Sequence, residues 1–163
     1  FTDQLMGELR KTGVEIIVAT LDIGWGTFRP ISADNIHDHK MDSEEFLLLE
    51  SAAKTINKAK AEGRRVISVG TTCVRLLESN IKEHRGASNY IVGHGAGSTN
   101  LFITPGHQFK IIDGLVSNFH LPKSTLLLLV SALIGKENLF KTYNHAVDNG
   151  YRFYSFGDAM LMI

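Results

Sequence analysis

The spacing of hydrophobic and polar residues along the chain switches repeatedly between the periods of helices and strands. Apolar positions at intervals of three and four, several of them closed by a glycine or opened by a serine or threonine, are typical of amphipathic helices. This pattern predicts helices at residues 1–12, 50–62, 71–81, 124–134 and 137–149.

Continuous β-branched runs predict buried strands in the same chain. They lie at residues 14–23 and 64–70, with shorter strands expected at 101–104, 110–116 and 151–156. The glycine-rich residues 84–100 are expected to form a loop. Strands that alternate with helices of this length favour an α/β sheet or barrel, in which ligands bind at the carboxyl ends of the strands.

The composition indicates one folded domain. The chain has 163 residues, of which 44% are hydrophobic and 21% charged, enough for one core over residues 1–163. A single cysteine, Cys73, excludes an internal disulfide and fits a reducing cytosol. The longest apolar stretch, residues 126–134, is far shorter than the roughly 20 residues that cross a bilayer, and no signal peptide is recognisable. We therefore expect a cytoplasmic protein without a membrane partner.

The formal net charge is zero, but the charges are unevenly distributed. Residues 1–50 hold 4 basic and 10 acidic side chains, whereas residues 51–85 hold 8 basic and 3 acidic ones. A basic middle segment could attract a polyanion such as RNA. Solvated helix faces are the alternative interpretation of the same lysines and arginines.

The loop GWGTFRP follows the first predicted strand and contains candidate ligand-binding groups. Its glycines allow close approach of the backbone to a ligand, while a hydroxyl and a guanidinium offer donors. The sequence matches neither the Walker nor the dinucleotide spacing, so an ordinary turn is the alternative. The candidate positions of this loop are Gly24, Gly26, Thr27, Phe28 and Arg29.

A second candidate lies where the second predicted strand meets the next helix. Thr71 and Thr72 would add two hydroxyls to the free amides of a helix start, and Arg75 follows one turn later. Such a group could hold a carboxylate or phosphate. A threonine cap with Arg75 paired outward is the alternative. Cys73 would be a nucleophile only if its pKa were lowered, and no local feature requires that.

Residues 36–45, IHDHKMDSEE, concentrate imidazoles and carboxylates. The spacing permits a metal site but does not define one, and we expect no metal. Carboxylates such as Asp42 and Glu44 are instead candidate general bases if burial raises their pKa. His39 belongs to the same cluster.

The stretch SNFHLPKST precedes a leucine-rich helix. Ser124 or Thr125 can cap that helix, which leaves Asn118 and His120 beside its N-terminus. We expect these polar groups to face a ligand, with a capping loop that binds nothing as the alternative.

Several longer segments occur in a specific order: TLDIGWGTFRPI, then GRRVISVGTTCVR, then TNLFITPGHQFKIIDGLVSNFHLPKSTLLLLVSALIG, then YRFYSFGDAMLMI. His39, Met41, Ser43 and Glu44 lie between the first two. In this order, covering nearly the whole chain, they resemble the S-adenosylmethionine:tRNA ribosyltransferase-isomerases of queuosine biosynthesis.

The resemblance implies an unusual reaction. Members of the family transfer the ribosyl part of S-adenosylmethionine to 7-aminomethyl-7-deazaguanine in tRNA, releasing adenine and methionine and giving epoxyqueuosine. S-adenosylmethionine is thus expected as co-substrate and tRNA as partner.

The reaction needs a group that takes a proton from the carbon beside the sulfonium, and donors for the ribose and the leaving base. The expected catalytic residues are Asp22, His39, Asp42, Glu44 and His120. The expected cofactor-binding residues outside the first loop are Thr71, Thr72, Arg75, Asn118, Ser124 and Thr125. Three positions depart from the family pattern: Asp22 and Asp42 stand where histidines are usual, and Cys73 replaces a serine.

The resemblance also implies a longer protein. Its members are about twice this length, with a barrel-like large domain and an inserted small β-domain, so this chain is expected to be a C-terminal portion that lacks the first elements and the small domain. Open sheet edges would then favour self-association, and we expect little activity from the piece alone. A sugar-phosphate enzyme of α/β fold and a non-catalytic RNA-binding module are the alternative functions.

Overall fold

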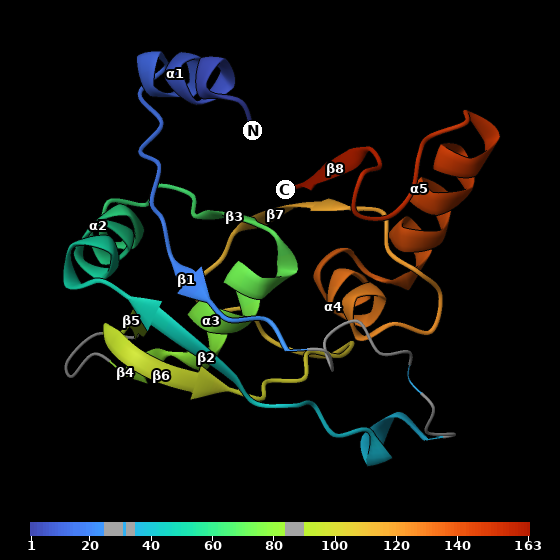
Figure 1. The fold of residues 1–163 in the computed structure, drawn as a ribbon, viewed down its shortest axis with the longest axis horizontal. Helices are drawn as coiled ribbons and strands as arrows, with labels where there is room; N and C mark the ends of the chain where they lie inside the picture. The colour runs from blue at the N-terminus through green and yellow to red at the C-terminus, as the bar shows by residue number, and fades with distance from the viewer. Residues whose placement is uncertain (25–30, 32–34, 84–89) are drawn as a thin grey trace.

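The computed structural model describes residues 1–24, 31, 35–83 and 90–163, apart from the side chains of residues 37 and 83. It shows a mixed α/β fold (Figure 1). Its described helices are α1 (Asp3–Lys11), α2 (Glu50–Ala61), α3 (Thr71–Ser79), α4 (Thr125–Ile134) and α5 (Lys136–Asp148), with a short 3-10 turn η2 at Ile36–Asp38. Its described strands are β1 (Thr20–Leu21), β2 (Glu44–Leu48), β3 (Ile67–Val69), β4 (Ile81–Glu83), β5 (Tyr90–Val92), β6 (Gly95–Thr99), β7 (Gly114–Asn118) and β8 (Ala159–Met162).

The described strands form three separate sheets. Their orders are β1-β2-β6, β3-β7-β8 and β4-β5. Only the β3–β7 pair is parallel among them, and the other pairs are antiparallel. The α/β class is therefore confirmed at the level of a mixed fold, while the described part of the chain contains no closed barrel.

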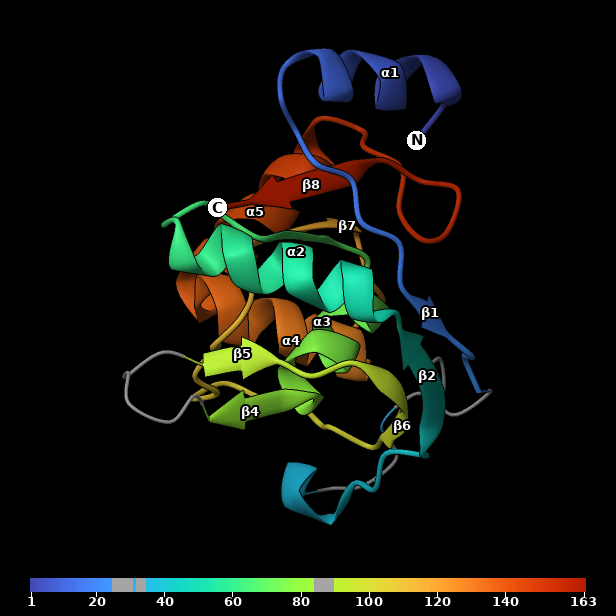
Figure 2. The same cartoon turned by 90° about the vertical axis from the view of Figure 1, so that its left-hand side faces the viewer.

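One hydrophobic core joins these sheets to the helices. Strand β2 alternates buried and exposed positions, which turns Phe46 and Leu48 inward. Helix α3 contributes Val74 and Leu76, and the apolar body of α4 contributes Leu129. Both views show α2, α3 and α4 gathered around the sheets, whereas α1 stands apart from them (Figures 1 and 2). Helix α1 accordingly has no buried residue.

The five predicted helices are confirmed, with ends that differ by a few residues. Ser124 caps α4, since its hydroxyl accepts the N–H of Leu127 at 3.2 Å. Gly135, at a φ of 81°, separates α4 from α5. The sequence located these helices well because periodicity and capping are local signals.

The strand predictions were less accurate. Residues 14–23 form a strand only at Thr20–Leu21, and Val14 and Val18 remain exposed. A β-branched run pairs only where a neighbouring strand offers its backbone, and the described chain gives residues 14–19 none. Residues 151–156 contain no strand: the first three have no regular structure and a turn follows, so the last strand begins at Ala159.

The predicted loop at residues 84–100 contains β5 and β6, so that prediction was wrong. Glycines are tolerated in β6 because the Phe46 ring packs over it: a Cβ built on Gly97 would lie 2.7 Å from Phe46 Cζ. The expected strand at residues 101–104 is absent. There the carbonyl of Leu101 accepts a side-chain hydrogen bond from Arg75, and no strand lies alongside.

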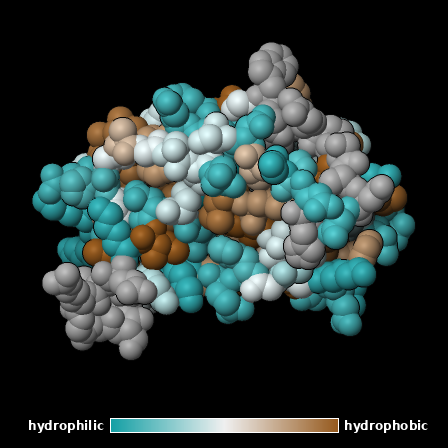
Figure 3. All heavy atoms as spheres, turned by 90° about the horizontal axis from the view of Figure 1, so that it is seen from below, coloured by the Kyte–Doolittle hydropathy of each residue, from teal (hydrophilic) through white to brown (hydrophobic). Residues whose placement is uncertain are grey.

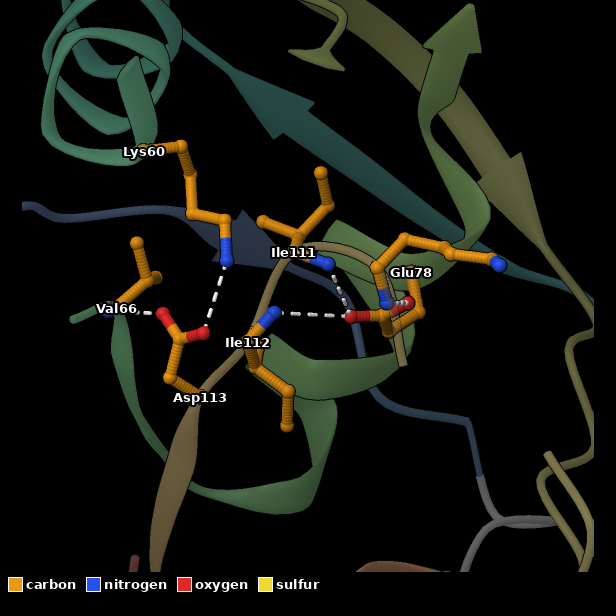
Figure 4. A network of polar contacts seen from close by, with 7 residues as sticks. Lys60, Val66, Glu78, Ile111, Ile112 and Asp113 are labelled. Atoms are coloured by element: carbon orange, nitrogen blue, oxygen red, sulfur yellow. Dashed lines mark hydrogen bonds and ion pairs between the residues drawn. The ribbon is translucent and has the colours of Figure 1, made fainter. Parts of the chain in front are cut away.

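Two acidic side chains fix the approach to β7 (Figure 4). Glu78 of α3 is fully buried, and its carboxylate accepts the N–H groups of Lys110, Ile111 and Ile112 at 2.9–3.0 Å. These amides are therefore satisfied by a side chain, which explains why the strand predicted at residues 110–116 starts only at Gly114.

Asp113 is the second of these acids. One carboxylate oxygen accepts the Val66 N–H at 2.8 Å, and the other is 2.9 Å from Lys60 Nζ. Its own backbone N–H donates to the Val66 carbonyl at 2.8 Å. Asp113 thus ties the start of β7 to the chain entering β3 and to α2.

Candidate functional site

The parallel pair β3–β7 forms the edge at which the candidate groups meet. Val69 is opposite Val116, and the next residue, Gly70, donates its N–H to the Val116 carbonyl at 2.8 Å. Both strands therefore end at the same edge of the sheet. The turn that follows β3 begins α3 at Thr71, and the turn that follows β7 leads to His120.

A surface hollow of about 410 Å³ lies at this edge. The backbone of Gly70, at a φ of 86°, brings the start of α3 to it without a side-chain cap on the first amides. Thr71 is buried and Thr72 half-buried. The lining residues are Phe1, Leu5, Val69, Gly70, Val116, Ser117, Asn118 and Ala159.

His120 is held by two hydrogen bonds beside the hollow. Its ring Nε2 lies 2.8 Å from Ser117 Oγ, and its backbone N–H donates to Tyr143 Oη at 2.8 Å. Burial lowers the pKa of His120 to about 4, so the imidazole is neutral at pH 7. Burial also raises the pKa of Tyr143, partly offset by the His120 N–H, and its hydroxyl stays protonated.

Asn118 faces the turn before β8. Its Nδ2 lies 3.4 Å from the carbonyl oxygens of Gly157 and Asp158. This amide links the end of β7 to the turn, and Phe119 does the same by accepting the Tyr154 N–H at 3.0 Å. Tyr154 has a φ of 71°, an uncommon value for a residue with a side chain, which this hydrogen bond helps to maintain.

Glu44 and Arg75 form a buried ion pair. Arg75 Nη1 contacts Glu44 Oε2, and both side chains are at most 3% exposed. Arg75 Nε also donates to the Leu101 carbonyl at 3.0 Å, and Glu44 Oε1 accepts the Gly24 N–H at 3.2 Å. The alternative of a threonine cap with Arg75 paired outward was therefore wrong: Arg75 pairs with an acid inside the protein, and no described side chain caps the start of α3.

The same contacts fix both ends of the glycine-rich loop. Gly24, at its start, is bound to Glu44, and Ile31, just beyond it, donates its N–H to the Lys123 carbonyl at 2.9 Å. The sequence had suggested that the loops after the first two predicted strands lie at one edge of a sheet. Strands β1 and β3 belong to different sheets, so this prediction was wrong. The candidates Gly26, Thr27, Phe28 and Arg29 lie outside the described residues.

The remaining acid–base candidates differ in exposure. Asp22 and Asp42 are exposed. His39 is half-buried with its ring 5.0 Å from that of Phe102, and its Nε2 makes no hydrogen bond within the described structure. Ser124 serves as the α4 cap, and Thr125 is buried at the first position of that helix. These five side chains do not line the described hollow, and neither do Thr71, Thr72, Arg75 and His120; among the described candidates Asn118 does.

The ion pairs of the basic side chains and the environment of Cys73 bear on two alternatives left open by the sequence. Lys54 and Lys58 pair with acids one turn away on α2, Lys60 pairs with Asp113, and Arg64 pairs with Glu15. This pairing supports solvated helix faces over an RNA-seeking surface on α2. Burial raises the pKa of the Cys73 thiol, which argues against a nucleophile.

The described residues contain no group of three or more histidine, cysteine, aspartate or glutamate side chains that could hold a metal. None of their helices is long and apolar enough to cross a membrane.

Ser117, Tyr143 and Glu78 were missed by the sequence reasoning. Tyr143 lies on a helix 23 residues beyond its partner, and no local pattern indicates that contact. Ser117 belongs to the quoted SNFHLPKST stretch, and its spacing of three from His120 was the available signal.

Comparisons with known proteins place the chain in a family. Residues 1–162 match the family model described as queuosine biosynthesis protein. The chain is 53% identical over 163 residues to the S-adenosylmethionine:tRNA ribosyltransferase-isomerase of Heliobacterium modesticaldum and 49% identical to that of Treponema denticola, covering all of this chain and 46% of each relative. It therefore spans about half the length of the curated relatives that it matches.

The solved structures agree with this result. The crystal structure of S-adenosylmethionine tRNA ribosyltransferase from Thermotoga maritima matches all of this chain and 50% of its own, with a TM-score of 0.78 and 37% identity. Fold and sequence thus point the same way over the full chain. The chain belongs to the queuosine biosynthesis protein family.

Proposed function

We propose that this chain carries part of the active site of an S-adenosylmethionine:tRNA ribosyltransferase-isomerase. The supporting observation is sequence identity of 50–53% to two enzymes of that name over all 163 residues. This range includes the segments at the shared end of β3 and β7. The substrates are S-adenosylmethionine and a tRNA. The reaction proposed is transfer and isomerisation of the ribosyl group to 7-aminomethyl-7-deazaguanine, giving epoxyqueuosine in tRNA.

The β3–β7 edge suits the methionine and ribose parts of the co-substrate. The first amides of α3 have no side-chain cap and carry the positive end of the helix dipole, which favours a carboxylate. Arg75 is already bound to Glu44, so Thr71 and Thr72, rather than the guanidinium, would hold the methionine carboxylate. Asn118 and His120 stand across the edge, where they would contact the ribose or the leaving adenine.

The proton from the carbon beside the sulfonium needs an acceptor. Glu44 is paired with a cation and buried, which makes it a poor base. Asp22, Asp42 and His39 remain the candidates for this role. Glu44 would act instead by holding Gly24 at the start of the glycine-rich loop.

We also propose that the sheets of this chain are completed toward a barrel by further strands. Several apolar side chains are exposed near β3 and β8, among them Val69, Leu161 and Ile163, and others are exposed at residues 14–18. They would be covered if further strands completed the sheets toward a barrel. Figure 3, which views the molecule from below and so from the side away from α1 and β8, shows further apolar patches exposed between polar ones. Segments of a longer protein or a second copy of the chain would supply the cover, and the chain alone would have little activity. Because the proposed substrate is a tRNA, we also propose a cytoplasmic location for the protein.

Isothermal titration calorimetry with S-adenosylmethionine tests the function. We expect binding, and weaker binding of S-adenosylhomocysteine, which lacks the positive charge. Replacing Thr72→Val should weaken binding several-fold, while Thr55→Val on α2 should leave it unchanged. A folded chain with no affinity for S-adenosylmethionine, or one that prefers a sugar phosphate, contradicts the proposal.

A further inference from the structure

His120 is held by groups from two different elements, one at its ring and one at its backbone N–H. Tyr143 comes from α5 and Ser117 from β7, and each lies 2.8 Å from its His120 partner atom. The aromatic ring of Tyr143 is in turn packed edge-to-face against Phe119 and Phe153, at 5.4 and 5.8 Å between ring centroids. Both the backbone and the ring of His120 are therefore restrained.

The hydroxyl of Ser117 decides which ring nitrogen carries the proton. Ser117 is only 7% exposed, and within the described structure Nε2 is the one partner of its Oγ. A buried hydroxyl seldom leaves its hydrogen without an acceptor, so Ser117 donates and Nε2 accepts. A neutral imidazole has a single N–H, and the hydrogen bond at one nitrogen sets the state of the other.

We infer that Ser117 is a positioning residue that holds His120 in the tautomer with its proton on Nδ1. His120 then carries its one N–H on Nδ1, with its basic nitrogen occupied by Ser117. Burial keeps the imidazole neutral, consistent with a pKa of about 4. Such a donor suits a ribose hydroxyl or a ring nitrogen of the departing adenine and does not suit abstraction of a carbon-bound proton.

The choice of acceptor rests on the proposed function, but the tautomer is a property of the chain by itself. Nitrogen NMR of the ¹⁵N-labelled chain at pH 7 measures it directly, because protonated and unprotonated ring nitrogens differ widely in chemical shift. The wild-type chain should show His120 with Nδ1 protonated and Nε2 unprotonated. His145 on α5 is an exposed reference histidine in the same spectrum.

Two substitutions separate positioning from simple structural support. Ser117→Ala should shift the tautomer ratio of His120 toward Nε2–H by about fivefold, the effect of losing one neutral hydrogen bond. Ser117→Thr keeps the hydroxyl and should preserve the wild-type ratio.

The spectrum of the wild-type chain tests the predicted tautomer even if a variant does not fold. A wild-type spectrum with the proton on Nε2, or a folded Ser117→Ala chain with an unchanged ratio, overturns it. Calorimetry with S-adenosylmethionine reports separately on the proposed function, since a chain that binds no S-adenosylmethionine can still show the predicted tautomer.

Discussion

The carboxylate of Glu78 should contribute strongly to stability, and Glu78→Gln tests it. The wild-type carboxylate serves three backbone N–H groups in full burial, those of Lys110, Ile111 and Ile112. Glutamine keeps one oxygen, which can still accept from Ile111 and Ile112. Its NH₂ group then faces the Lys110 N–H, which is left without an acceptor.

The expected cost follows from these contacts. An unsatisfied buried N–H costs about 1–3 kcal/mol, and the remaining two hydrogen bonds each lose roughly half of their charge-assisted strength. We expect Glu78→Gln to lower the free energy of unfolding by about 3 kcal/mol. That is a large part of the total stability of a domain, typically about 5–15 kcal/mol.

Urea denaturation followed by circular dichroism measures this change. Glu45→Gln on β2 is the matched control, because it removes the same charge from an exposed side chain and should change stability by less than about 0.5 kcal/mol. If the two variants unfold at the same urea concentration with equal slopes, the capping role of Glu78 is refuted.

Three other predictions concern buried groups. Glu44→Gln should destabilise the chain by about 3–5 kcal/mol in urea denaturation because Arg75 keeps a buried charge, and adding Arg75→Met should recover part of the loss. The depressed pKa of His120 means that its stabilising effect is complete above pH 6.5 and falls by up to about 3 kcal/mol as pH drops to 4; His120→Asn should flatten this pH dependence of unfolding. Because burial raises its pKa, the Cys73 thiol should react with iodoacetamide at pH 7.5 more slowly than the thiol of free glutathione does. A rate above that of glutathione would contradict this prediction.

The helices were predictable because their signals are contained within a few turns of chain. The serine at position 124 and the glycine at 135 mark the ends of α4 in the sequence and in the structure alike. A strand needs a partner that the sequence does not name. Residues 14–23 have the composition of a strand throughout, yet they pair only at Thr20 and Leu21, opposite β2.

The sequence indicated that the turns carrying Thr71 and His120 meet, but not that the strand before the glycine-rich loop belongs to another sheet. Parallel pairing of β3 with β7 brings the Thr71 and His120 turns to one edge, as expected for the carboxyl ends of parallel strands. The partners of each polar side chain come from distant elements, so the sequence could not assign them. Glu44 and Arg75 are 31 residues apart and Tyr143 is 23 from His120.

These pairings change what each residue can contribute. Arg75 lies one turn along the helix from Thr71 and looked suited to an anion, but its guanidinium is neutralised by the buried Glu44. Likewise, an imidazole whose Nε2 is hydrogen-bonded to Ser117 is a weaker candidate for a base, and Asp42 is exposed, so the burial that the sequence argument required of this carboxylate is not found.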